Sequence, residues 1–188
     1  MADTRENCIF AALKHERMKK IDLTELHDNV FDTIGREWML VTSGSPEHFN
    51  TMTASWGCLG FLWGKPVAVV FIRPERYTHE FVESNTTLTL SFLGHGEKAR
   101  KAYSFLGSKS GRDVENKAVA AGLTPVATEH GSVGFAESRL TLVGKKLYKG
   151  DIQPDRFLDP DISRWYGEKQ GGYHDVYIVE LLDAFVAE

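Results

Sequence analysis

The sequence has few of the residues that mark disulfide-rich proteins and zinc proteins. It contains two cysteines, Cys8 and Cys58, which lie far apart, and it has no Cys-x-x-Cys motif and no Cys/His cluster. This spacing indicates neither a disulfide framework nor a metal site, so we expect no bound metal and two reduced thiols. Cys58 lies in an apolar stretch and is interpreted as a small core residue.

Long apolar runs and an excess of positive charge are also missing. No run approaches the ~20 residues that a membrane helix needs, and Met1 to Lys20 lacks the apolar stretch of a secretory signal. The formal net charge is -4 at pH 7, which gives no general attraction to nucleic acid or to anionic membranes. We therefore expect a cytoplasmic protein with neither a nucleic-acid nor a membrane partner.

Several catalytic motifs are absent as well. The chain has no G-x-G-x-x-G after a strand, no P-loop, no G-x-S-x-G elbow and no H-E-x-x-H, and its seven histidines are scattered. These absences argue against a Rossmann dinucleotide site, a serine nucleophile and a catalytic zinc.

What the chain does contain is enough apolar material for one core, with 42% hydrophobic residues in 188. We expect one domain over residues 20–188, preceded by an N-terminal extension, residues 1–19, that could form a peripheral charged helix. The patterns predict strands at 38–42, 51–57, 66–72, 86–93, 138–148 and 175–182. They predict helices at 24–34, 98–105 and 113–121, and a short helix capped by Thr78. The strand at 66–72 should be fully buried and the one at 86–93 half-buried. This order is mostly β with short helices, and it favours a closed barrel over a doubly wound sheet.

One candidate site follows the buried strand, in the run Arg73–Pro74–Glu75–Arg76–Tyr77–Thr78. Two arginines, a hydroxyl and a helix start together form a candidate anion site, because guanidinium groups and free helix N–H groups both bind phosphate oxygens. The alternative is a solvated loop with a surface ion pair to Glu75.

A second candidate is the run Asn50–Thr51–Met52–Thr53–Ala54–Ser55–Trp56. Its small side chains would let a planar ligand approach the backbone, its amide and N–H groups could bond a heterocycle, and Trp56 could pack beside a ring. The alternative is a Thr-rich edge strand with a core Trp. Taken together, the two runs suggest a phosphate site and a ring site for one ligand, and FMN has both parts.

With these two runs, the sequence resembles a known family, the flavin-reductase-like, FMN-binding split-barrel proteins, with flavoredoxin as the nearest kind of member. The resemblance rests on ordered motifs: Trp38–Thr42, Asn50–Gly57, Leu62–Val67, Arg73–Thr78, Ser110–Val114, Ala121–Pro125 and Tyr173–His174. It runs from about Lys20 to the C-terminus.

The resemblance implies a split β-barrel that binds FMN, usually as a homodimer. It implies that Asn50, Met52, Thr53, Ala54, Ser55 and Trp56 line the ring and the ribityl chain, and that Arg73, Arg76 and Thr78 hold the phosphate or lie close to it. Lys117 would face the flavin or its phosphate, although Asn116 stands where the family pattern has Asp. His174 would face the flavin as a candidate catalytic residue, or else be a hydrogen-bonded core or interface histidine.

The sequence is compatible with three functions. The first is an NAD(P)H-dependent flavin oxidoreductase, with NADH or NADPH as the electron donor. The second is a flavoredoxin-like electron carrier with tightly held FMN and a protein redox partner. The third is a binding or structural domain without redox activity.

Overall fold

An antiparallel sheet organises residues 18–188, which are the residues that the computed structural model describes. Its eight strands follow the order β3-β2-β6-β9-β10-β5-β4, and β1 pairs with β10 outside this path. They are β1 (Met18–Ile21), β2 (Met39–Ser45), β3 (His48–Ala54), β4 (Gly57–Leu62), β5 (Lys65–Ile72), β6 (Thr87–Phe92), β9 (Leu140–Asp151) and β10 (Asp175–Ala187). Two further strands, β7 (Pro125–Ala127) and β8 (Val133–Phe135), form a separate pair.

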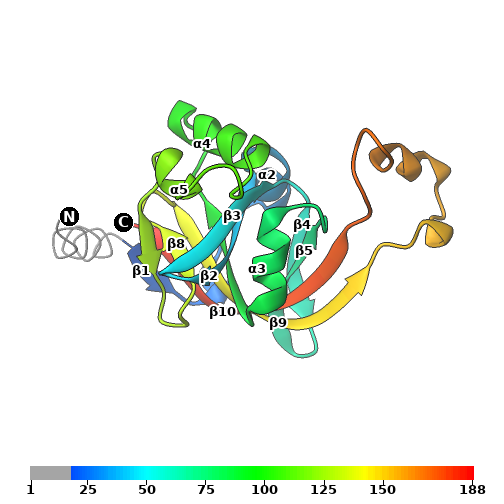
Figure 1. Cartoon of the computed structure of the whole chain (residues 1–188). Helices are drawn as coiled ribbons and strands as arrows, with labels where there is room; N and C mark the ends of the chain where they lie inside the picture. The colour runs from blue at the N-terminus through cyan, green and yellow to red at the C-terminus, as the bar shows by residue number, and fades with distance from the viewer. Residues whose placement is uncertain (1–17) are drawn as a thin grey trace.

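Short helices connect these strands and cover parts of the sheet (Figure 1). They are η1 (Leu23–Glu25), α2 (Val30–Asp32), η2 (Thr33–Glu37), α3 (Tyr77–Ser84), α4 (Glu97–Ser108), α5 (Lys117–Ala120), η3 (Pro154–Arg156) and η4 (Pro160–Trp165). Within residues 18–188, no helix is long and apolar enough to cross a membrane.

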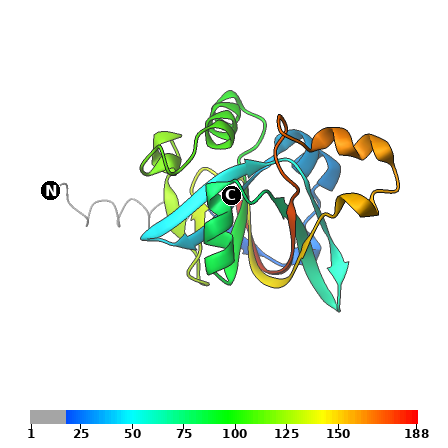
Figure 2. The same ribbon diagram turned by 45° about the vertical axis from the view of Figure 1, so that its right-hand side comes forward.

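The sheet curls round so that its two ends meet. β3 ends at Ala54 and β4 begins at Gly57, so three residue steps, at most about 11 Å, separate the first and last strands of the order. Figure 2 shows the strands wrapping around a common interior, with residues 152–174 projecting to one side. We call this segment between β9 and β10 the flap. The architecture agrees with the barrel that the sequence predicts.

The interior is filled by the apolar side chains of neighbouring strands. β5 contributes Ala68, Val70 and Ile72, all fully buried, but Val69 and Phe71 on its other face are only partly buried, so the full burial expected for this strand holds for one face. A second cluster forms where α4 packs through Ala99, Ala102, Tyr103 and Leu106, whose spacing places them on one helix face. This packing fixes α4 beside β3, where the candidate site lies.

Several elements differ from the predictions. The helix expected at 24–34 is broken into η1, α2 and η2, and Phe31 is 86% exposed, because side-chain caps from Asp22 and Asn29 start new turns. The strand expected at 51–57 is divided between β3 and β4. The strand at 86–93 is buried on both faces, since Thr89 and Ser91 are buried along with its apolar residues.

The predictions made for three positions near the candidate site are also wrong. The helix expected at 113–121 begins only at Lys117, because Asn116 has a left-handed backbone with φ of 47°. Thr78 is not a cap: α3 begins one residue earlier, after Arg76, and Thr78 is buried inside it. Cys58 is exposed and not a core residue, because β4 is the last strand of the sheet order.

The proposed N-terminal extension lies mostly outside the described residues, together with Cys8 and nearly all of the helix suggested for Ala2 to Lys19. Its suggested boundary after residue 19 falls within β1, which pairs with the C-terminal part of β10.

Candidate functional site

Three adjoining cavities lie along β3, and they are lined by all eleven candidate residues from the sequence. The first cavity, of about 330 Å³, is lined by Met52, Thr53, Ala54, Ser55, Trp56, Phe71, Arg73, Arg76, Trp165 and His174. The second, of about 160 Å³, contains Asn50, Met52, Arg76, Thr78 and Lys117 along with the loop at residues 107–111. The third, of about 310 Å³, lies at the start of β3 and is lined by His48 to Thr51 and by residues 114–118.

The second cavity is electropositive. Arg76 is half-buried and Lys117 is 5% exposed, and within residues 18–188 no carboxylate forms an ion pair with either. The Lys117 ammonium donates to the carbonyls of Lys109 at 3.0 Å and Leu106 at 3.3 Å. Burial, with a contribution from Arg76, lowers the pKa of Lys117 to about 8. Burial and the charge of Arg73 also lower the pKa of Arg76. Two crowded cations without a counter-ion make an anion site.

Polar groups of β3 and α3 complete this cavity. The Asn50 amide donates to the Thr78 hydroxyl at 2.8 Å, and both side chains are buried. Gly111 lies directly against Asn50, since a Cβ added there would be 2.2 Å from the Asn50 Oδ1. A larger residue at position 111 would therefore displace the amide. Glu75 also lines the cavity, but its carboxylate accepts the backbone N–H of Gly172 in the flap.

The first cavity is bordered by aromatic rings from distant parts of the chain. The Trp56 ring centroid lies 5.6 Å from that of Trp165 and 5.1 Å from that of His174. Met52 to Ser55 also line this cavity, and the Thr53 hydroxyl donates to the Tyr103 carbonyl at 2.7 Å. A planar, partly apolar ligand fits such a lining.

Arg73 contacts the flap through several groups. Its Nε donates to the His174 Nε2 at 3.2 Å, and a terminal nitrogen donates to the Trp165 carbonyl at 3.1 Å. The guanidinium also lies 5.8 Å from the centre of the Tyr166 ring. Arg73 therefore lines the first cavity and holds the flap beside it, whereas Arg76 lines both the first and the second.

His174 is kept neutral by its surroundings. Its Nε2 accepts from Arg73, a group that can only donate, so its proton is on Nδ1, 3.4 Å from the Tyr166 hydroxyl. Burial, with a contribution from the Arg73 charge, lowers its pKa to about 4.

An ion-pair network anchors α3, whose first turn supplies Thr78. His79 contacts Asp175 at 2.8 Å, and Lys149 lies 2.9 Å from both Asp175 and Glu83. The ligand atoms of His79, Glu83 and Asp175 lie within 4.8 Å of one another, but the Lys149 ammonium already pairs with both carboxylates. We interpret this network as a structural tie between α3 and strands β9 and β10.

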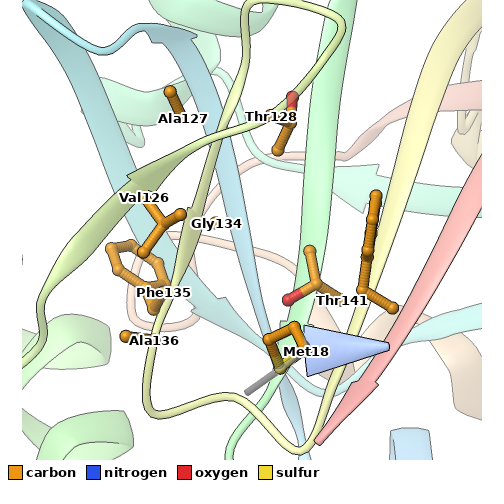
Figure 3. A pocket seen from close by; sticks show the side chains of 9 residues that line it. Met18, Val126, Ala127, Thr128, Gly134, Phe135, Ala136 and Thr141 are labelled. Atoms are coloured by element: carbon orange, nitrogen blue, oxygen red, sulfur yellow. The ribbon is translucent and has the colours of Figure 1, made fainter. Parts of the chain in front are cut away.

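A separate cavity near β1, β7 and β8 differs in size and chemistry (Figure 3). It measures about 30 Å³, roughly the share of one water molecule, and its lining includes Met18, Val126 and Phe135. It is too small for a nucleotide.

Sequence reasoning missed the contribution of Trp165 and of the loop at 107–111. Trp165 lies in the flap, which has no periodic pattern, and it reaches Arg73 across 92 residues of sequence. The Ser110–Gly111 pair was part of the family resemblance, but only its contact with Asn50 shows its place in the site.

Comparison with known proteins identifies the family of this chain. The model of the flavin reductase like domain family matches residues 31–188. No curated protein sequence matches the chain.

Solved structures resemble the chain at low sequence identity. An FMN-binding domain of a flavin reductases-like enzyme from Shewanella baltica has a TM-score of 0.63 at 18% identity, covering 90% of this chain and 77% of that one. Flavoredoxin of Desulfovibrio vulgaris has a TM-score of 0.61 at 20% identity, with coverage of 90% and 78%. An NADH:FAD oxidoreductase from Streptomyces globisporus has a TM-score of 0.58 at 17% identity, with coverage of 79% and 73%. These likenesses confirm the mostly-β, split-barrel fold that the sequence predicts.

Proposed function

The chain belongs to the flavin reductase like domain family, and from this premise we propose that it binds FMN and transfers hydride to it from NADH or NADPH. The observation that carries the proposal is the second cavity, where Arg76 and Lys117 crowd together without a carboxylate partner. A dianionic phosphate is the counter-ion that these two cations lack.

The residues of the two cavities fit the parts of FMN in order. Arg76, Lys117 and Thr78 would hold the phosphate in the second cavity, and Asn50 would lie beside it. Met52 to Trp56 would flank the ring in the first cavity, where the small side chains of Thr53, Ala54 and Ser55 leave the backbone accessible. The fit therefore rests on charge at one end and on a flat, aromatic lining at the other.

When bound, FMN would supply a ring that accepts a hydride, and with it two electrons, from the nicotinamide. The chain would contribute position and electrostatics. His174 stays neutral, holds its proton on Nδ1 and supports the flap through Arg73, so we assign it a positioning role. Trp56 and Trp165 would exclude water from one side of the ring.

The test is a visible spectrum of the purified chain after incubation with FMN and desalting, followed by anaerobic titration with NADH and NADPH. We expect a flavin band that either nucleotide bleaches. Arg76→Ala should weaken FMN binding by about 1.5–3 kcal/mol, the range for a lost hydrogen bond to a charged group. An unchanged dissociation constant would remove Arg76 from the phosphate site.

A second function is favoured by the likeness to flavoredoxin, which has the same fold and similar coverage. On this alternative the chain is an electron carrier that receives electrons from a protein partner. A retained band that neither NADH nor NADPH bleaches would support the carrier and contradict the reductase.

We also propose that a second copy of the chain covers β4, the end strand of the sheet. Phe61 is 74% exposed and Trp63 is 59% exposed, and the Trp63 ring lies 6.5 Å from that of Tyr148. An apolar patch on an edge strand is typical of an interface. Sedimentation velocity should show a dimer that Phe61→Glu dissociates, and a monomeric wild-type chain would refute this.

A further inference from the structure

A further cavity lies apart from the flavin site, between α4 and the turn that follows α5, two helices on the same side of the sheet (Figure 1). We call it the helix cavity. Its volume is about 400 Å³, compared with about 330 Å³ for the first cavity, and this is within the range of small-molecule sites. Its lining comes from residues 98–102 of α4, from residues 121–123, and from Leu93 and Glu137. None of its lining residues lines the three cavities along β3, so it is a separate site.

The lining of the helix cavity is mostly apolar, and small residues keep it open. Ala99, Ala102 and Leu123 belong to the second hydrophobic cluster, and Leu93 packs against that cluster. Gly122 has a left-handed backbone with φ of 82°, and a Cβ added there would meet no atom within 4 Å. An apolar ligand that enters such a space gains free energy because it removes apolar surface from water.

Positive charge lies on the α4 side of the helix cavity. Lys98 and Lys101 both line it, and because they are three positions apart they share one helix face. Within residues 18–188, Lys98 forms no ion pair, and Lys101 pairs with the exposed Glu97. The lining includes one carboxylate, that of Glu137, which accepts the Thr124 backbone N–H at 2.8 Å and the Thr124 hydroxyl at 2.9 Å. A ligand with an apolar body and an anionic group on the α4 side therefore complements this lining.

Both walls of the helix cavity are connected to Lys117. On the α4 side, the Lys117 ammonium donates to the carbonyls of Leu106 and Lys109 at the end of the helix. On the other side, the backbone N–H of Ala121 donates to the Lys117 carbonyl at 3.1 Å. A ligand that contacts both walls therefore fixes the spacing of α4 and α5, and this spacing positions the Lys117 ammonium.

From this lining we propose that the helix cavity binds an amphipathic carboxylate, and that its occupancy tightens flavin binding. The alkyl chain would lie against the apolar residues, and the carboxylate would lie at Lys98, which has no ion-pair partner of its own within residues 18–188. The site itself does not depend on the proposed function, whereas its effect on flavin rests on it. A cationic amphiphile of the same chain length would be repelled by the two lysines.

The experiment is isothermal titration calorimetry of the full chain with decanoate, and with decyltrimethylammonium as the cationic probe of equal chain length. We expect one equivalent of decanoate to bind, and to bind more tightly than the cation. Lys98→Glu should weaken decanoate binding at least fivefold, because it replaces an attraction by a repulsion. Lys98 lies in the first turn of α4, where a carboxylate is favourable, so this variant should fold. Lys169→Glu, which reverses an exposed lysine of the flap, is the matched control.

Ala121→Phe is the second variant, since its ring would fill part of the helix cavity and should abolish decanoate binding. Urea unfolding checks that this variant is folded. Decanoate that does not bind, that binds no more tightly than the cation, or that binds equally well to both variants and to wild type would overturn the proposed site.

The coupling is measured by titrating FMN with and without saturating decanoate, and we expect FMN to bind at least threefold more tightly when decanoate is present. An unchanged FMN dissociation constant would overturn the coupling and leave the helix cavity as a binding site. Failure to bind FMN under either condition would refute the proposed function, and with it the coupling, while decanoate binding would be judged by its own titration.

Discussion

Replacing Lys117 by Met should stabilise the ligand-free chain and weaken its flavin binding. The ammonium is 5% exposed, and its pKa of about 8 lies well below the ordinary 10.5. At 1.36 kcal/mol per pH unit, holding this charge at pH 7 costs about 3 kcal/mol. Methionine removes that cost but also removes the hydrogen bonds to Leu106 and Lys109, which contribute about 1–2 kcal/mol in all. The free energy of unfolding should therefore rise by about 1–2 kcal/mol.

The pH dependence provides a sharper test. Between pH 8 and 10.5 the unfolded chain binds the Lys117 proton and the folded chain does not, so wild-type stability rises with pH across that window. Lys117→Met lacks this rise, so the difference between the two proteins should shrink as the pH approaches 10.5. Urea unfolding of both proteins at pH 7, 8.5 and 10 measures this difference in the free energy of unfolding.

The same substitution should weaken FMN binding about 10- to 100-fold at pH 7, because a charge-assisted hydrogen bond to phosphate is lost. Lys101→Met, which removes an exposed ammonium paired with Glu97, is the control and should change neither quantity much. A Lys117→Met chain that is less stable than wild type at pH 7 and binds FMN equally well would refute the argument.

Three further predictions concern the walls of the site. Gly111→Ala should weaken FMN binding at least tenfold in calorimetry by displacing the Asn50 amide, whereas Gly107→Ala, whose added Cβ stays 3.5 Å from its nearest neighbour, should not. Arg73→Leu should release the flap, so that trypsin cleaves within residues 152–174 faster than in wild type; an equal rate would show that other contacts hold it. Wild-type stability should fall as the pH drops from about 6.5 to 4, because the unfolded chain protonates the His174 imidazole first, and His174→Gln should reduce that slope; parallel curves would contradict the assignment.

The sequence predicts well those elements whose signal is local. The continuous apolar run at 66–72 is strand β5, and the spacing in 98–105 is helix α4. The candidate site residues also lie together, since all of them line adjoining cavities, and their roles toward a flavin stay predictions. In contrast, the helix expected from 113 starts at Lys117, because the left-handed backbone of Asn116 interrupts it.

Contacts between distant segments are what local patterns miss. From the residues around it in the sequence, Arg73 is predicted to be one more phosphate ligand. In the fold its N–H groups donate to His174 and to the Trp165 carbonyl. Cys58 looks apolar and internal, but it is exposed because β4 is at the end of the sheet order, which depends on how all eight strands pair. Neither fact is encoded within a window of a few residues.

The two-residue junction between β3 and β4 has a thermodynamic consequence. Ser55 and Trp56 line the first cavity, and one residue further on begins the strand that carries Phe61. If ligand binding shifts this junction, the edge strand moves with it, and the proposed pairing of two copies there would in turn change the ligand site. Because linkage is reciprocal, flavin binding and the proposed dimerisation would change each other's free energy by the same amount. The apparent flavin affinity of this chain would then depend on the protein concentration at which it is measured.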